Sequence, residues 1–191
     1  MFLTTLELVL FDVDGTLVRP KSGKEFRETP ADWDFLPGRV DAIKGLIQSG
    51  PAAALVTNQG GAAYGYFKVS EMSHQLALTA QRLGIGEARR GSYRNNGIYV
   101  CFTHPDGTVE GMTEDAGNSV FHKLPNRRKP GPGMIQEAMR DYGATPEFTL
   151  MVGDRPEDKG AAEAAGCQFM WADEFFSTPP SPSAQGLEKE G

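Results

Sequence analysis

Two aspartates, Asp12 and Asp14, stand two residues apart in the segment FDVDGTLV, directly after an apolar run. Alternate side chains of an extended chain point to the same side, so we expect the two carboxylates to lie close together. Neighbouring carboxylates repel each other and need a cation or a shared proton. Magnesium prefers carboxylate oxygens, so the pair is a candidate metal site. The competing interpretation is that Asp and Gly15 only end a strand and form a turn.

Three further segments carry side chains suited to phosphate chemistry. Thr57 and Asn58, in LVTNQGG, supply a hydroxyl and an amide that can bind phosphate oxygens. Lys129, in RRKPGPGM, can neutralise the charge of a bound phosphate. Asp154 follows an apolar run in VGDRPEDKG, and Asp158 lies four residues later, where the start of a helix also favours negative charge. Each segment alone is equally compatible with a polar turn, a solvated loop or a helix cap.

The apolar runs before these motifs predict a parallel sheet. We expect strands at 6–11, 52–56, 98–102, 148–152 and 167–171. Helical periodicity and capping residues predict helices at 37–50, at 70–84 with Ser70 as N-cap, at 133–142 and at 156–165. This alternation predicts an α/β fold of three layers, with a Rossmann-like parallel sheet between helices. Ligands of such sheets bind at the carboxyl ends of the strands, where the motif residues fall.

Length and composition indicate one globular domain. The chain has 191 residues, 39% of them hydrophobic and 23% charged. We expect the domain to cover 1–176, with a flexible tail rich in Pro and Ser at 177–191. No run approaches the roughly 20 apolar residues of a membrane span, and the N-terminus lacks the basic start of a secretion signal. Cys101 and Cys167 are expected to be reduced thiols of a cytoplasmic protein.

The order and strand placement of the four motifs resemble the haloacid dehalogenase (HAD)-like hydrolase superfamily, over nearly the whole chain up to Phe176. The resemblance implies a HAD-like fold and a magnesium-dependent phosphatase. It implies that Asp12 is the nucleophile and forms an aspartyl phosphate. It also implies that Asp14 protonates the leaving oxygen and later deprotonates the attacking water. An acid at position 14 favours phosphatase over dehalogenase chemistry, because a halide needs no proton to leave.

The same resemblance assigns the remaining site residues. Thr57 would bind the transferring phosphoryl group with Asn58 beside it, and Lys129 would offset the negative charge. Apart from the resemblance, we expect Arg128 to bind substrate because it adjoins Lys129 in the sequence. The Mg²⁺ ligands would be a carboxylate oxygen of Asp12, the backbone carbonyl of Asp14 and the carboxylate of Asp154, with Asp158 supporting the site through water.

Many members of the superfamily carry a large inserted cap domain over the site. Here the stretches between Asp12, Thr57 and Lys129 are filled by predicted helices, strands and loops, so no large cap is expected. An uncapped site is open to solvent. It accepts a bulky substrate, or a small one if a local loop or a partner subunit in a homo-oligomer closes it.

The sequence resembles two branches of the superfamily. Ser22-Gly23-Lys24, Phe26 and Asp32-Trp33 are similar to the segment after the nucleophile in polynucleotide kinase 3′-phosphatases. The segments YVCFTHPDG, KPGPGM and GDRPEDKGAAEAAG resemble the histidinol-phosphate and heptose-bisphosphate phosphatases. Members of that branch often carry zinc on Cys-x-His and Cys-x-Cys pairs. Thr103 and Arg127 stand at two of those positions, so no zinc site is expected.

The sequence therefore does not decide between two classes of substrate. A phosphorylated sugar or other small metabolite is favoured by the net charge of −6, because duplex binding depends on neutralising phosphates. A nucleic-acid 3′ end is the alternative within the same chemistry. We also expect the loop at 103–128, Lys21, Lys24 and the Arg127–Arg128 pair to influence substrate choice. A third alternative, a phospho-accepting signalling receiver, is disfavoured because the predicted third strand ends in Phe102-Thr103 without an acid.

Overall fold

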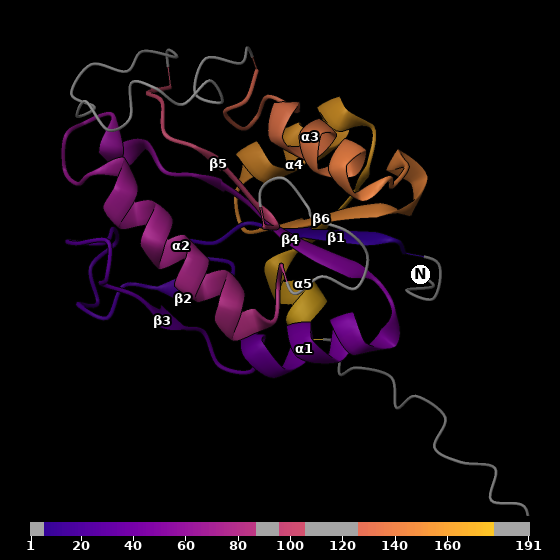
Figure 1. Cartoon of the computed structure of the whole chain (residues 1–191), viewed down its shortest axis with the longest axis horizontal. Coiled ribbons are helices and arrows are strands. Elements are labelled where there is room, and N and C mark those ends of the chain that lie inside the picture. Colours follow the sequence, from indigo (N-terminus) through magenta and orange to yellow (C-terminus); the bar gives the residue numbers. More distant parts are fainter. Residues whose placement is uncertain (1–5, 87–95, 106–125, 178–191) are drawn as a thin grey trace, which may run out of the picture.

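The computed structural model describes residues 6–86, 96–105 and 126–177. Its centre is a five-stranded, fully parallel sheet in the order β5–β4–β1–β6–β7 (Figure 1). The strands are β1 (Leu8–Phe11), β4 (Ala52–Asn58), β5 (Ile98–Cys101), β6 (Thr149–Gly153) and β7 (Gln168–Trp171). Each of the five expected strands is present, with ends that differ by one or two residues, so the predicted α/β class is confirmed.

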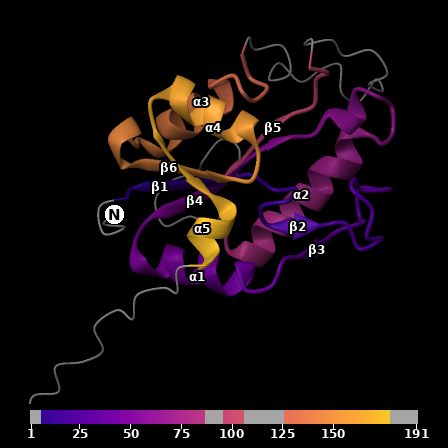
Figure 2. The same ribbon diagram turned by 180° about the vertical axis from the view of Figure 1, so that it is seen from behind.

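Helices cover both faces of the sheet and complete three layers (Figures 1 and 2). One face carries α1 (Arg39–Ser49), α2 (Val69–Leu83) and α5 (Ala172–Ser177), and the other carries α3 (Gly133–Tyr142) and α4 (Pro156–Ala165). Strand β1 supplies both cores: Val9 and Phe11 face one, while Leu8 and Leu10 face the other. A strand that is covered on both faces is apolar at every position, which explains the continuous run in the sequence.

Several short elements were not predicted. Strands β2 (Val18–Arg19) and β3 (Asp34–Phe35) form an antiparallel pair, too short to leave a periodic signal. The 3₁₀ turns η2 (Gly60–Ala62) and η5 (Pro146–Phe148) and helix α5 are also additions. The predicted start of α2 is wrong by two residues: Lys68 is the N-cap, and its backbone N–H donates to Glu71 Oε2 at 3.2 Å.

Between the strands that carry the motifs, the described chain holds only short elements. β2, β3 and α1 lie between β1 and β4, while η2 and α2 lie between β4 and β5, so no large cap is evident in the part that the structure describes. No helix within 6–86, 96–105 or 126–177 is long and apolar enough to cross a membrane. The proposed tail at 177–191 lies outside the described residues apart from Ser177.

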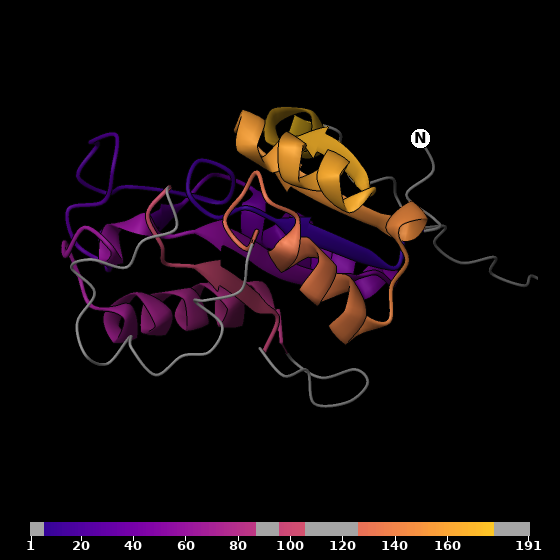
Figure 3. The same ribbon diagram turned by 90° about the horizontal axis from the view of Figure 1, so that it is seen from above.

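The strand order brings the motifs together. β1 lies between β4 and β6, and Phe11 is in register with Leu55 on one side and Val152 on the other. Asp12 continues this register, since its N–H donates to Val152 O at 3.0 Å. The carboxyl ends of three adjacent strands therefore meet at one edge of the sheet. Seen from above, the chain that follows β1, in indigo, projects at one end of the molecule (Figure 3).

Candidate active site

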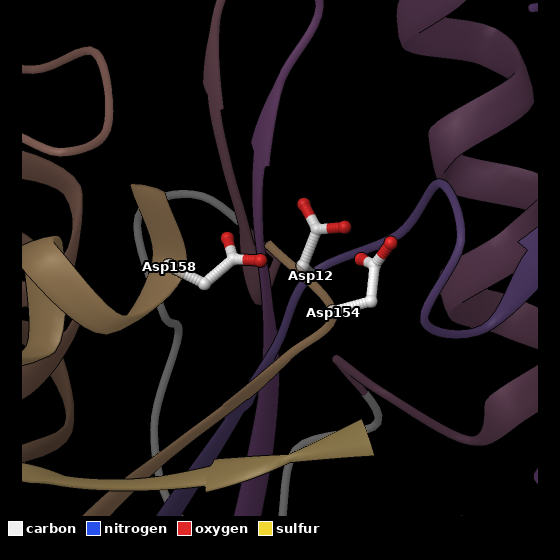
Figure 4. A group of neighbouring side chains, drawn as sticks. All are labelled: Asp12, Asp154 and Asp158. Atoms are coloured by element: carbon white, nitrogen blue, oxygen red, sulfur yellow. The ribbon is translucent and has the colours of Figure 1, made fainter. Parts of the chain in front are cut away.

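Three carboxylates converge at this edge (Figure 4). Asp12 follows β1, Asp154 follows β6, and Asp158 lies in the first turn of α4. Each offers an oxygen within 4.8 Å of the other two. Asp12 and Asp158 are buried, whereas Asp154 is exposed. Such a cluster of like charges requires a compensating cation, and its oxygen ligands suit Mg²⁺.

Lys129 supplies one positive charge to this cluster. Its Nζ lies 2.6 Å from Asp12 Oδ1 and 2.5 Å from Asp158 Oδ1, and it donates to Val56 O at 2.8 Å. The lysine side chain is only 3% exposed. No described residue donates a hydrogen bond to the second oxygen of Asp12, Oδ2, so that oxygen is left for an incoming atom. Lys129 thus neutralises one side of Asp12 and leaves the other side open.

The end of β4 presents its residues to two different sides, because side chains alternate along a strand. The side chain of Asn58 faces the loop before α3: its Nδ2 donates to Lys129 O at 3.0 Å, and its Oδ1 accepts from Lys129 N at 3.1 Å. Asn58 therefore holds the lysine backbone and uses one of its two amide N–H donors to do so. Thr57 is buried on the other side, where its Oγ1 accepts from Gln59 Nε2 at 3.0 Å.

Both oxygens of Asp14 are held by donors that sequence reasoning missed. Gln59 Nε2 donates to Asp14 Oδ2 at 2.6 Å, and Arg27 Nε donates to Asp14 Oδ1 at 2.6 Å. Gln59 had a sequence signal, because it shares a face of β4 with Thr57. Arg27 had none, since it lies in an irregular segment between β2 and β3.

The acid cluster changes the proton affinities of its members. Burial raises the pKa of Asp12 from 3.8 to about 7, assisted by the charge of Asp158 and opposed by Lys129. Burial also raises the pKa of Asp154, against a hydrogen bond from Thr16 Oγ1 to Asp154 Oδ1 at 2.9 Å. For Lys129, burial opposes the charged form, but Asp12 and Asp158 outweigh it and raise its pKa. Lys129 therefore stays charged, while the acids need a further cation to ionise fully.

Two glycines make room for the carboxylates. A Cβ placed on Gly15 would lie 2.2 Å from Asp154 Oδ2, and Gly15 has a φ of 90°, which a side chain disfavours. A Cβ on Gly153 would lie 2.3 Å from Asp158 Oδ2. Asp158 also accepts a hydrogen bond from Arg155 N at 3.0 Å, so it caps α4 as well as joining the acid cluster.

The two arginines before Lys129 have separate surroundings. Arg128 Nη1 donates to Thr103 O at 2.8 Å and lies 3.3 Å from the place of a Cβ on Gly60, beside the end of β4. Arg127 is instead buried, where it pairs with Glu137 of α3 and donates to Val100 O of β5. Arg127 thus ties the loop to the core and does not face the acid cluster's open side. Most of the expected substrate loop, 106–125, lies outside the described residues.

This arrangement belongs to the HAD-like phosphatases. Asp12 follows the central strand β1, and Thr57 lies on β4. Asp154 and Asp158 follow β6, and Lys129 lies in the loop before α3. The chain is a member of the polynucleotide kinase 3 phosphatase family, because the sequence model of that family matches residues 7–178. The alternative of a signalling receiver is therefore not retained, and the described end of β5 carries no acid.

Curated relatives and solved structures agree on the class. The chain is 34% identical over 158 residues to the D-glycero-beta-D-manno-heptose-1,7-bisphosphate 7-phosphatase of Haemophilus ducreyi, covering 83% of this chain and 78% of the relative. It is 36% identical over 157 residues to the enzyme of the same name from Photorhabdus laumondii, covering 82% and 74%. A solved D,D-heptose 1,7-bisphosphate phosphatase from B. bronchiseptica, complexed with magnesium and phosphate, matches with 27% identity and a TM-score of 0.59, covering 86% of this chain and 79% of that one.

Proposed function

We propose that the chain is a magnesium-dependent phosphomonoesterase that acts through an aspartyl phosphate on Asp12, with a phosphorylated sugar as substrate. The observation that carries this proposal is the pairing of Asp12 with Lys129 through Oδ1, while Oδ2 has no hydrogen-bond donor among the described residues. A nucleophile must keep one oxygen free while its charge is partly balanced. The names of the heptose-bisphosphate phosphatase relatives support the sugar substrate.

The reaction follows from these contacts in two steps. In the first step an oxygen of Asp12 bonds to phosphorus, the bond to the ester oxygen breaks, and Asp14 gives that oxygen a proton. In the second step water attacks the same phosphorus, its proton passes to Asp14, and inorganic phosphate leaves Asp12. Lys129 stays paired with Asp12 and Asp158 and offsets negative charge beside the phosphoryl group, while the hydroxyl of Thr57 would bind a phosphoryl oxygen. Catalysis thus consists largely of positioning and charge neutralisation.

The donor set fits magnesium. Asp12 and Asp154 would provide carboxylate oxygens, Asp14 its backbone carbonyl, and Asp158 support through water. The raised pKa values of Asp12 and Asp154 are consistent with a site that lacks part of its positive charge. When bound, the ion would neutralise charge on the transferring phosphoryl group.

A panel of phosphate esters tests this proposal. The full chain should release phosphate from a heptose bisphosphate and from p-nitrophenyl phosphate in Mg²⁺, and EDTA should stop both reactions. Zinc should not restore them. After an acid quench during turnover, peptide mass spectrometry should find the phosphate on Asp12. Lack of phosphate release from every ester, or a label on another residue, contradicts the proposal.

A second candidate is a 3′-phosphatase of nucleic-acid ends. It is favoured by the family match and by an exposed aromatic pair next to the site. Tyr64 and Tyr66 are 51% and 76% exposed and stack on each other at 5.7 Å between ring centroids, five to seven residues after Gln59. Exposed aromatic rings suit stacking on an unpaired base. A 3′-phosphorylated oligonucleotide hydrolysed faster than the sugar phosphates would make this the main activity.

We further propose a cytoplasmic location. Neither cysteine forms a disulfide: Cys101 is buried, and Cys167 is partly buried. Burial raises the pKa of the Cys167 thiol to about 11, so it stays protonated and unreactive near neutral pH. Detection of the native protein outside the cytoplasmic fraction would contradict this.

A further inference from the structure

Arg27 is a buried side chain in a segment that is otherwise largely exposed. It lies between β2 and β3, where the side chain of Arg27 is only 6% exposed while the neighbouring Phe26 is 63% exposed. An arginine that turns inward from such a segment gives up hydration. Its contacts inside the molecule must therefore account for its position.

Those contacts centre on Asp14. Arg27 Nε donates to Asp14 Oδ1 at 2.6 Å, and Nη1 donates to Pro30 O at 3.2 Å. The third nitrogen, Nη2, is buried and has no hydrogen-bond partner among the described residues. Nη2 shares the guanidinium edge with Nε, and that edge commonly binds both oxygens of one carboxylate. Here the second oxygen of Asp14 is bound by Gln59 instead.

Asp14 is thus held from two sides by residues from different parts of the fold. Gln59 reaches it from the end of β4 and also donates to Thr57, while Arg27 reaches it from the segment after β2. The unpaired Nη2 costs folding free energy, because a buried donor without an acceptor has lost its water. Unfavourable local features such as an unpaired buried donor are kept mainly where function requires that arrangement of side chains.

We propose that Arg27 is a positioning residue that fixes Asp14 for proton transfer to the leaving-group oxygen and from the attacking water. This inference rests on the proposed function, in which Asp14 is the acid and base. Gln59 shares the task, but Arg27 alone comes from the segment that carries the exposed Phe26. The position of the Asp14 carboxylate therefore depends on the conformation of this partly exposed segment between β2 and β3.

The test depends on the leaving group. A phenolate such as p-nitrophenolate leaves without much help from an acid, whereas the alkoxide of a sugar phosphate needs a proton. Arg27→Met should therefore lower kcat/KM, which covers the steps up to departure of the leaving group, about tenfold to a hundredfold for a sugar phosphate and only about twofold for p-nitrophenyl phosphate. The later attack of water is common to both substrates and does not enter this ratio. Arg27→Lys keeps the charge but not the planar edge, so it should show the same selectivity to a smaller degree.

Controls separate positioning from a general loss of structure. Arg19→Met removes an exposed arginine on β2 and should leave both rates unchanged. In an Asp14→Asn background, Arg27→Met should have little further effect, because the residue that it positions is already disabled. Equal losses on both substrates in Arg27→Met and Arg27→Lys, or full additivity with Asp14→Asn, overturn the inference.

The same experiment distinguishes this inference from the proposed function. If the unaltered chain hydrolyses neither ester in Mg²⁺, the proposed function fails. If it hydrolyses both and the Arg27 variants show no selectivity between them, the proposed function stands and the role of Arg27 is rejected.

Discussion

The buried centre of the site and its exposed rim are built in opposite ways. In the centre, Lys129 contacts Asp12 and Asp158 directly, and each of the three is almost fully buried. At the rim, Tyr64 and Tyr66 stack on each other in solvent, and Tyr64 meets the edge of His104 at 4.2 Å between ring centroids. The centre joins four distant segments of the chain, whereas Tyr64 and Tyr66 belong to one turn.

This difference separates the reaction from the choice of substrate. The central residues restrain one another, so a change in any of them should disturb both charge balance and geometry. Tyr64 and Tyr66 at the rim are exposed, so substitutions there should cost the fold little. We infer that phosphoryl transfer depends on the centre and that the rim affects mainly the leaving group. The predictions below test this division.

The largest effect is expected for Asp12→Asn. An amide cannot attack phosphorus, so turnover of every ester should fall on the order of 10⁴-fold or more. Rates of phosphate release from p-nitrophenyl phosphate measure the loss, and circular dichroism should show an intact fold. Residual activity above a hundredth of the original rate would assign the nucleophile to another group.

Lys129→Met should rank second. Removing the lysine leaves two buried carboxylates without their counter-ion, so activity should fall about 10²- to 10³-fold and the melting temperature should also drop. Lys159→Met is a matched control, because among the described residues Lys159 pairs with the exposed Glu163 on the same helix, α4. A variant of Lys129 that behaved like the control would contradict a central role for the lysine.

Magnesium affinity should depend on pH with a defined sign. The pKa of Asp12 is raised to about 7, so protons compete with the metal below that pH. The Mg²⁺ dissociation constant should increase up to about tenfold per unit as pH falls from 7 to 6 and change little above 8. Calorimetric titrations at these pH values measure it. A dissociation constant that stays the same from pH 6 to 8 would refute the link to Asp12.

The metal-free protein should show the opposite trend in stability. The folded-state pKa of Asp12 lies above its unfolded value of 3.8, so the folded protein binds this proton more tightly. Its contribution to stability is therefore present below about pH 4 and is lost as pH rises toward 7. Melting temperatures in EDTA should reflect this loss, and saturating Mg²⁺ should reverse it at pH 8.

The smallest effect is expected at the rim. Tyr66→Ala should change the rate with a sugar phosphate by no more than about twofold and leave the melting temperature unaltered, as is usual for exposed positions. The same variant assayed on a 3′-phosphorylated oligonucleotide sharpens the comparison. A larger loss on that substrate would favour the nucleic-acid activity, while a large loss on both would place Tyr66 with the central residues.

The sequence predicted the sheet and the residues of the centre for a physical reason. Strands buried on both faces appear as unbroken apolar runs, and the acids stand directly after them, so Asp12 and Asp154 could be placed from position alone. Thr57 was expected directly after its strand and lies within it, because β4 extends to Asn58. The site assignments themselves remain predictions until they are tested by mutation.

Other parts could not be predicted because they depend on side-chain contacts over long distances. Arg27 reaches Asp14 from an irregular segment, and no spacing rule indicates which arginine of a loop turns inward. Asn58 was expected at the phosphate, but alternation along β4 turns its side chain toward the Lys129 backbone. The ion pair between Arg127 and Glu137 was not predicted either, because it depends on how the loop before α3 packs against that helix.

The two glycines that adjoin the carboxylates have a consequence for engineering this enzyme. Positions 15 and 153 contribute no functional group, yet any side chain there would collide with Asp154 or Asp158. A mutational survey restricted to titratable and polar residues would overlook them. Saturation libraries should keep glycine at both positions, because the carboxylates of Asp154 and Asp158 occupy the space that a side chain would need.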